Sequence, residues 1–218
     1  MRGNSCAIAS HDYFERMTHV IFLRIIAVFF LILAFSITLR AANEQEIIAK
    51  AKAGNGWALL ELDKIPKLSD ETMTYLRTQA NQPFCPPNSP TEYSRILLAK
   101  RGDQKAFDLL KAGLKNSVPS VQIGAFQNLG RVGNDKAIVT LAEYIGNDQR
   151  PVDKVFERKK PFPTYQQLAI FELSKIVKNP VSSPSDVDSV SDGDVTKWKN
   201  WWKANREKYD AAMKTLAR

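Results

Sequence analysis

The stretch SVQIGAFQNLGRVGNDKAIVTLAEYIGND, residues 120–148, decides the fold. Its apolar residues recur at spacings of three and four, which predicts two short α-helices rather than strands. Gly133 is placed to end the first helix in the left-handed conformation, and Asn134 is placed to cap the second. One helical hairpin cannot cover its own apolar face, so we expect it to pack against further units of the same kind.

An earlier segment repeats this pattern. LLAKRGDQKAFDLLKAGLKN, residues 97–116, aligns with residues 128–147 at an offset of 31. Leu98 matches Leu129 and Gly102 matches Gly133, while Lys100 with Arg131 and Asp103 with Asn134 are near matches. Residues 97–116 therefore have the same predicted turn and cap as residues 128–147.

A partial third copy, YQQLAIFELSKIV, covers residues 165–177 and aligns with residues 121–133 at an offset of 44, so that Lys175 matches Arg131. Upstream, GWALLELDKIPKLSDETMTYLRTQ, residues 56–79, is a degenerate earlier pair. Self-similarity of this kind is typical of repeat architectures. We therefore expect an all-α fold with about three to four helical hairpins.

Residues 120–148 resemble a HEAT repeat of the short type named after phycobilisome lyases. The residues that carry the resemblance are Ala125, Leu129, Gly133, Asp135, Ala137, Ile138 and Leu141. The resemblance implies an α-α superhelix, a HEAT/armadillo-like solenoid over residues 43–180, whose surfaces bind other macromolecules. It does not imply lyase activity, because a fold by itself does not define a function.

The N-terminal segment has the features of an export signal. Residues 20–39 carry a single charge, Arg24, which an unbroken apolar run over residues 25–35 follows. Two alanines come after it at 41 and 42, so residues 1–42 are predicted to be a secretory signal peptide. Met17 is an alternative start. The other interpretation is a retained membrane anchor, since residues 20–39 are about long enough to span a bilayer. In both cases we expect the rest of the chain to be exported, in the periplasm or cell envelope of a bacterium.

Export changes the chemistry that the remaining chain can offer. Both histidines, His11 and His19, precede the apolar run, and Cys85 is the one cysteine that follows it. Cys85 is expected to be a packed thiol, with an intermolecular disulfide as the alternative. The chain after residue 42 contains no Gly-rich phosphate loop, GxSxG motif or paired cysteines. We therefore predict a non-enzymatic protein with no catalytic residues, metal or cofactor; carboxylate-based glycoside chemistry is the remaining enzymatic alternative.

The charge of the exported part is moderately basic. Residues 1–42 hold four Lys/Arg and two Asp/Glu, so the 31 basic and 23 acidic residues of the whole chain fall to 27 and 21, a net charge of +6. In an exported protein this favours anionic lipid, polysaccharide or an acidic protein surface over nucleic acid, which we do not expect as a partner. A solvated surface with excess lysine is the simpler interpretation.

An insert separates the second and third repeat copies. Within DQRPVDKVFERKKPFPT, residues 148–164, basic and aromatic side chains alternate between prolines. Insertions in solenoids often form the binding face. The predicted partner-binding residues are Lys154, Phe156, Arg158, Lys159, Lys160 and Phe162. The alternative is an irregular connection whose phenylalanines fold back on the repeats.

Residues 181–193 are expected to be a Ser/Asp/Pro linker. The acidic part, SDVDSVSDGD, resembles a calcium loop only superficially, because Val190 and Ser191 stand where an EF-hand needs Asp/Asn and Gly. We instead expect Asp194 to cap a final helix over residues 194–218.

The final helix contains TKWKNWWKANREKY, residues 196–209. At 100° per residue its large apolar side chains fall in one stripe about 120° wide. Trp198, Trp201, Trp202 and Tyr209 lie on that stripe. They predict an amphipathic helix that caps the last apolar face of the stack, whereas an exposed sugar-binding platform is the competing interpretation.

These observations predict a non-catalytic protein-protein interaction scaffold that acts outside the cytoplasm on an unknown protein partner. One alternative is a membrane-anchored HEAT-like adaptor that contacts the membrane through the uncleaved N-terminal segment alone. The other is a carbohydrate-binding or other ligand-binding envelope protein.

Overall fold

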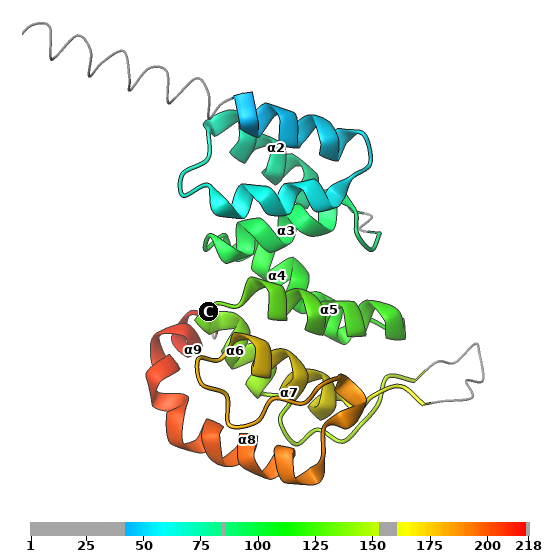
Figure 1. Ribbon diagram of the computed structural model, residues 1–218, viewed down its shortest axis with the longest axis vertical. Coiled ribbons are helices and arrows are strands. Elements are labelled where there is room, and N and C mark those ends of the chain that lie inside the picture. The colour runs from blue at the N-terminus through cyan, green and yellow to red at the C-terminus, as the bar shows by residue number, and fades with distance from the viewer. Residues whose placement is uncertain (1–41, 84–85, 153–160, 217–218) are drawn as a thin grey trace, which may run out of the picture.

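The structure is a computed structural model that describes residues 42–83, 86–152 and 161–216 (Figure 1). Throughout these ranges the regular secondary structure is helical, with no strand, which confirms the all-α prediction. Residues 1–41 of the predicted leader, with both histidines, as well as Cys85 and residues 153–160 of the insert, lie outside the described residues.

The N-terminal part contains the degenerate pair predicted over residues 56–79. Residues 42–52 are helical and are followed by η1 (Gly56–Lys64) and α2 (Asp70–Ala80). The first member of the pair, η1, is a 3₁₀-helix rather than an α-helix. Both members pack on α3 (Pro90–Lys100), and Leu59, Leu62 and Leu76 are fully buried there.

Two matching hairpins form the middle of the molecule. The first is α3 with α4 (Gln104–Ala112), extended by the 3₁₀-helix η2 (Gly113–Lys115), and the second is α5 (Pro119–Val132) with α6 (Asp135–Ala142). The predicted turns and caps are confirmed in both. Gly102 and Gly133 have φ of +92° and +64°, which is the left-handed region that glycine tolerates best.

The two cap residues act in the same way. The carboxylate of Asp103 accepts a hydrogen bond from the backbone N–H of Ala106 at 2.9 Å. The side-chain oxygen of Asn134 accepts one from the backbone N–H of Ala137 at 3.0 Å. Each bond satisfies an N–H that the helix itself leaves without a partner.

The third copy begins with α7 (Tyr165–Ile176), whose N-terminus is capped by a capping box of Thr164 and Gln167. The insert leaves and returns at the same place, because the N–H groups of Tyr165 and Gln166 donate to the carbonyls of Gln149 and Asn147, each at 2.9 Å. The segment after α7 includes the 3₁₀-helix η3 (Val187–Ser189), which packs on α7.

The C-terminal segment differs from the single helix predicted over residues 194–218. It consists of α8 (Asp192–Asn205), the 3₁₀-helix η4 (Arg206–Tyr209) and α9 (Asp210–Leu216). The cap of α8 is Ser191 rather than Asp194. The Ser191 hydroxyl accepts from the N–H of Asp194, whose carboxylate in turn accepts from the N–H and hydroxyl of Ser191, a reciprocal capping box.

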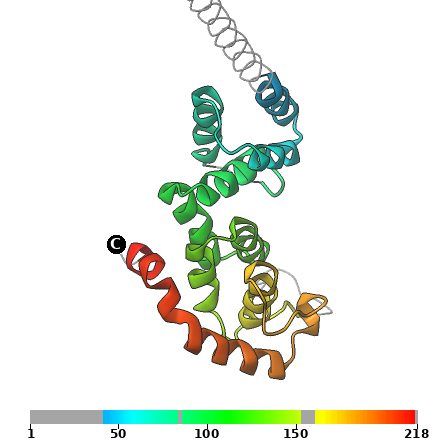
Figure 2. The same ribbon diagram turned by 60° about the vertical axis from the view of Figure 1, so that its left-hand side comes forward.

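The helices pack mainly against their neighbours in the chain. η1, α3, α5 and α7 follow one another as a row of contacting elements along the long axis of the molecule, and α2, α4 and α6 pack beside that row (Figure 1). Figure 2 shows the C-terminal segment, orange to red, curving back along the molecule, where α8 contacts α7 and α9 contacts α6.

Candidate binding surface on the helix row

The most distinctive surface feature is an exposed tryptophan on the helix row. The Trp57 side chain, from η1, is 52% exposed, and its ring lies 5.1 Å from the ring of Tyr93 on α3, centroid to centroid. The guanidinium carbon of Arg131, on α5, lies 5.4 Å from the Trp57 ring centroid and 5.7 Å from that of Tyr93. These are cation–π distances, so the three side chains hold one another in place. We call them the Trp57–Arg131 cluster.

A buried polar network supports this cluster from below. One oxygen of the buried Glu92 carboxylate accepts from Asn128 Nδ2 at 2.7 Å, and the other accepts from the backbone N–H of Asn88 at 2.5 Å. Tyr93 donates its hydroxyl to Asn88 Oδ1 at 3.0 Å. Arg131 Nη1 donates to Asn128 Oδ1 at 3.3 Å. The Asn128 amide therefore connects a buried carboxylate on α3 to the surface guanidinium on α5.

A second carboxylate lies between α5 and α7. Glu172 is only 5% exposed, and its side chain occupies the space that a Cβ atom at Gly130 would need. Burial raises the pKa of Glu172. Two interactions oppose this shift: Oε1 accepts a hydrogen bond from Lys175 Nζ at 2.7 Å, and the positive charge of Arg131 lies nearby. The Lys175 ammonium also lies 3.7 Å from the centroid of the Phe171 ring.

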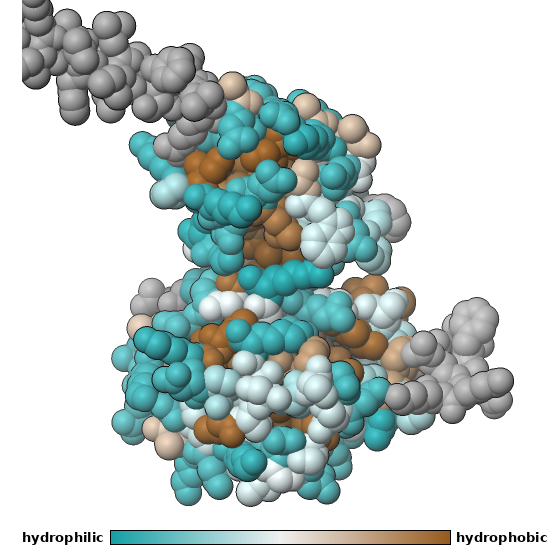
Figure 3. Space-filling view, in the orientation of Figure 1, coloured by the Kyte–Doolittle hydropathy of each residue, from teal (hydrophilic) through white to brown (hydrophobic). Residues whose placement is uncertain are grey.

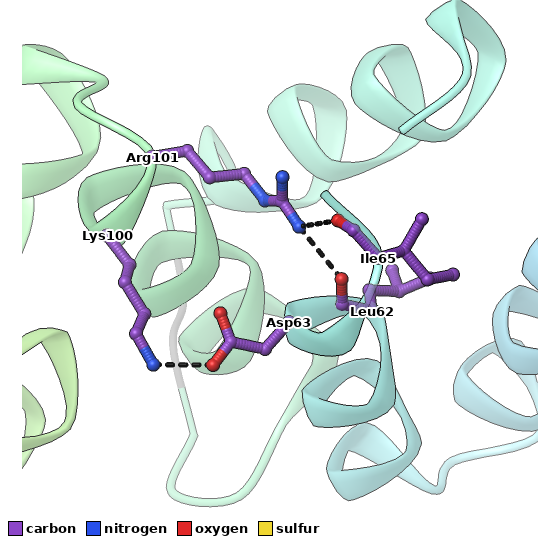
Figure 4. A network of polar contacts seen from close by, with 5 residues as sticks. All are labelled: Leu62, Asp63, Ile65, Lys100 and Arg101. Carbon is purple, nitrogen blue, oxygen red and sulfur yellow. Dashed lines mark hydrogen bonds and ion pairs between the residues drawn. The ribbon is translucent and has the colours of Figure 1, made fainter. Parts of the chain in front are cut away.

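The first hairpin has a comparable polar contact with η1 (Figure 4). Lys100 Nζ forms an ion pair with Asp63 Oδ2 at 2.5 Å, while Arg101 Nη2 donates to the carbonyls of Leu62 and Ile65, each at 2.8 Å. Arg101 thereby satisfies carbonyls at the end of η1, a structural role. The neighbouring Lys100, in contrast, keeps 41% of its side chain exposed on the helix row.

Three basic residues occupy matching positions in the repeat alignment. Lys100, Arg131 and Lys175 come from α3, α5 and α7, which contact one another in that order. We call these three residues the basic row. They offer charged hydrogen-bond donors, and Arg131 lies next to the flat apolar surface of the Trp57 ring, which is recognition chemistry rather than bond-breaking chemistry.

The residues predicted from the insert are mostly outside the described part of the chain: this applies to Lys154, Phe156, Arg158, Lys159 and Lys160. Phe162 is described and is partly buried, and its carbonyl accepts from Arg150 Nη1 at 2.6 Å. At the base of the insert, Tyr165 packs on Phe126, with ring centroids 6.0 Å apart. The role predicted for the insert stays a prediction.

The C-terminal aromatic residues are buried to different degrees. Trp198 has no exposed surface, and its indole Nε1 donates to Ser182 Oγ at 3.0 Å. Trp201 and Trp202 are partly buried, and Tyr209 packs against both, with centroids 6.3 and 5.8 Å away. Burial of the stripe is therefore complete at Trp198 and partial at the other three positions.

Several residues of the candidate surface were not predicted. The match of Arg131 with Lys100 and Lys175 was visible in the alignment, but Trp57, Tyr93, Glu92 and Asn128 were not singled out. The repeat alignment did contain one signal for Asn128. At the position where the first hairpin has the apolar Leu97, the next two copies have the polar residues Asn128 and Glu172. Trp57 had no such signal, since η1 departs from the repeat pattern.

Comparison with protein-family models, with curated proteins and with solved structures finds no match to this chain. Across residues 42–83, 86–152 and 161–216, no helix has the length and apolar character needed to cross a membrane. Within the same ranges, no group of three or more His, Cys, Asp or Glu side chains is arranged to hold a metal ion.

Proposed function

We propose that the chain is a HEAT-like α-solenoid that acts as a non-catalytic protein-interaction scaffold outside the cytoplasm. Two features support the solenoid. The hairpins share a glycine turn and a side-chain cap at matching positions, and each helix packs mainly on its neighbours in the chain. Stacks of this kind present long surfaces that suit macromolecular partners.

The Trp57–Arg131 cluster is the observation that carries the proposed binding role. A large aromatic side chain held half exposed by its neighbours has lost much of its conformational freedom before any partner arrives, which lowers the entropic cost of binding. Tryptophan and arginine are also the residues most often found at the energetic centre of protein interfaces. Figure 3 shows further hydrophobic patches over α5, next to hydrophilic surface, and exposed Val118 and Val121 lie at the start of that helix.

Site-specific photo-crosslinking in the native host tests this function. A photo-reactive amino acid replaces Trp57 in one variant and Thr196, exposed on α8, in the control. We expect a discrete adduct with a second protein at position 57 and none at position 196. Absence of an adduct at position 57, or the same adducts at both positions, contradicts the proposal.

The insert provides a second test of partner binding. The variant Lys154/Arg158/Lys159/Lys160→Ala removes its four cations and is expected to capture less of the partner identified by crosslinking. If this variant captures as much partner as the parent does, the insert is not part of the proposed interface. It does not affect the assignment of Trp57, which the first experiment measures separately.

Export is proposed on the apolar segment alone. N-terminal sequencing of the protein from a membrane-free envelope fraction is expected to begin at Asn43. Recovery of the full-length chain in the membrane fraction favours the membrane-anchored adaptor instead. Recovery in the cytoplasm contradicts both versions. For the ligand-binding alternative, strong quenching or a strong shift of the tryptophan fluorescence by candidate glycans is the decisive observation.

A further inference from the structure

From the helix row we infer that its binding surface recognises an extended, carboxylate-bearing protein segment, with Arg131 as the central contact. This rests on the proposed scaffold function and specifies the partner class. The segment is expected to carry acidic side chains three residues apart and to cross α3, α5 and α7 along the basic row, Lys100, Arg131 and Lys175.

The first argument is the hydrogen-bonding capacity of Arg131. A guanidinium group has five N–H donors, and here Nη1 donates to Asn128 Oδ1 at 3.3 Å, a long bond. The nearest buried carboxylate on α3, Glu92, has both oxygens occupied by Asn128 and Asn88. The Tyr93 hydroxyl and the Glu172 carboxylate also interact with Arg131, and Glu172 Oε1 already accepts from Lys175. Because these groups do not use all five donors, Arg131 retains N–H groups for a ligand, and a carboxylate is the group that fits the guanidinium edge in two parallel bonds.

The second argument is that Arg131 is already oriented. Its guanidinium carbon lies 5.4 Å from the Trp57 ring centroid and 5.7 Å from that of Tyr93, two cation–π contacts from different helices. Because the two rings and Asn128 restrict the side chain, binding needs little further ordering of Arg131. The exposed Trp57 ring next to it offers an apolar contact for a neighbouring residue of the segment.

The third argument is the spacing of the basic row. Packed helices lie roughly 8–10 Å apart. A polyproline II segment has three residues per turn and advances about 9 Å in that turn. Side chains at i, i+3 and i+6 therefore point to one side and recur at about the distance between successive helices. A β-strand would place i and i+3 on opposite sides, so the polyproline II conformation fits better.

The existing ion pairs of the basic row do not prevent this binding. The side chains of Lys100 and Asp63 are 41% and 36% exposed, and pairs this exposed contribute little and can exchange partners. The Lys175 side chain is 46% exposed, while its partner Glu172 is almost completely buried. Because burial raises the pKa of Glu172 and disfavours its charged form, that carboxylate neutralises Lys175 less well than an exposed one would.

An acidic polysaccharide is the main competing ligand. Sugar chains usually stack on successive flat rings, but Trp57 is the one exposed tryptophan of the four, all of which lie in the described part of the chain. A single exposed ring with one cation, Arg131, beside it, and further cations on the neighbouring helices α3 and α7, favours a peptide. The net charge of +6 after residue 42 is compatible with both ligands, so the experiment includes both.

The test uses the protein from Asn43 onward and three probes followed by fluorescence anisotropy. The first is a labelled proline-rich nonapeptide with glutamates at positions 1, 4 and 7, and the second has the same composition with three consecutive glutamates. The third is a labelled polygalacturonate oligomer. We expect the first peptide to bind at least about tenfold more tightly than the second, and its affinity to fall with added salt.

Matched variants locate the site. Arg131→Gln is expected to weaken binding of the first peptide at least tenfold, and Arg131→Lys is expected to weaken it by a smaller factor because the charge stays while the bidentate contact is lost. Arg77→Gln, on α2 away from the helix row, serves as the control and should bind like the parent. Because Arg131 also packs on two rings, Lys100→Ala and Lys175→Ala provide a second measurement in side chains that are more exposed; each is expected to reduce affinity severalfold.

Three results overturn the inference. The first is equal affinity for the two peptides, which would indicate unspecific charge attraction. The second is no binding of either peptide at millimolar concentration. The third is binding of the polygalacturonate alone. None of these removes the crosslink expected at position 57, so failure of the acidic-segment inference remains distinguishable from failure of the scaffold function.

Discussion

Gly130 is a position where the absence of a side chain allows two helices to approach closely. A Cβ atom built there would lie 2.1 Å from Oε2 and 3.2 Å from Cβ of Glu172 on α7. Gly130→Ala is therefore expected to lower the free energy of unfolding by about 1–3 kcal/mol, the usual cost of overpacking. Urea denaturation monitored by circular dichroism measures the change.

Gly124, six residues earlier on the same helix, is the matched control. A Cβ atom there meets no atom within 4 Å, so Gly124→Ala should raise the free energy of unfolding by about 0.5–1 kcal/mol through helix propensity. If the two variants shift the denaturation midpoint equally and in the same direction, the close contact with Glu172 is not what selects glycine at position 130.

Glu172 should make the stability depend on pH in an unusual direction. Burial raises its pKa above the ordinary value of 4.5, with the Lys175 hydrogen bond and charge opposing the shift. The folded protein therefore holds this proton more tightly than the unfolded chain does. The contribution to stability is fully present below about pH 4.5 and is lost as pH rises through the raised pKa.

The comparison of the parent with Glu172→Gln isolates this effect, because glutamine keeps the shape but does not titrate. The free energy of unfolding of the parent, relative to that of the variant, is expected to decline as the pH increases from 4.5 toward neutrality. Urea titrations at several pH values provide the measurement. Parallel pH profiles would show that the Glu172 carboxyl has the same pKa in both states.

At the scale of single elements, the helix caps give a graded prediction. Asp103→Ala and Asn134→Ala each remove a cap and should each cost about 1 kcal/mol. Asn134 also donates Nδ2 to the carbonyl of Ala99 at 3.1 Å, which joins its helix to the preceding hairpin. Asn134→Ala should therefore cost more than Asp103→Ala, and Asn134→Asp, which retains the cap but loses the donor, should fall between parent and Asn134→Ala. Thermal unfolding ranks the variants; equal losses would exclude the contact with Ala99.

The C-terminal helix α8 is expected to be held mainly by Trp198. Its ring is completely buried and its Nε1 is hydrogen-bonded to Ser182, so Trp198→Ala should cost about 3–5 kcal/mol. Trp202→Ala, at a partly exposed ring, should cost clearly less. Chemical denaturation tests the order. If Trp198→Ala melts like the parent but loses a ligand, the aromatic residues bind rather than support the fold.

How well the elements could be predicted depends on whether they are determined locally. The turns at Gly102 and Gly133 and the caps that follow them were predictable, because backbone conformation and one nearby side chain decide them. The interruption of the last helix at Arg206 was not, since the segment after it bends to contact α6, which is remote in sequence. Ser191 replaced Asp194 as the cap because the serine–aspartate pair forms a reciprocal box one turn earlier.

The candidate surface was predictable only where the repeats are regular. Alignment of the copies places Arg131 between Lys100 and Lys175, so the basic row follows from the sequence. The exposed ring beside Arg131 does not, because Trp57 belongs to a 3₁₀-helix without a counterpart in the other copies. Cation–π contacts between such distant residues depend on how the elements pack, which spacing alone does not determine.

For the whole molecule, the row arrangement implies that stability is distributed along the chain. η1 and α2 contact α3, whereas the C-terminal elements η4 and α9 contact α6. In a stack, each unit is stabilised mainly by its neighbours, so the two ends can respond separately to a change at one of them. The contacts of Asn128 with Glu92 and of Arg131 with Trp57 join the two halves near the middle.

Deletion of residues 206–218 tests this separation. It removes η4 and α9, exposes the side of α6 that they cover, and takes away Tyr209, which packs on Trp201 and Trp202. Hydrogen exchange followed by mass spectrometry is expected to show at least about tenfold faster exchange in α6 and α8, because their opening free energies fall by at least about 1.4 kcal/mol. Exchange in α2 and α3 should stay close to that of the parent, since neither helix packs on the deleted segment.

Trp202→Ala serves as a milder change at the same end and should affect the same helices to a smaller degree. A uniform acceleration that reaches α2 would show that the chain unfolds as one cooperative unit, and the polar contacts between α3 and α5 would then couple its two halves.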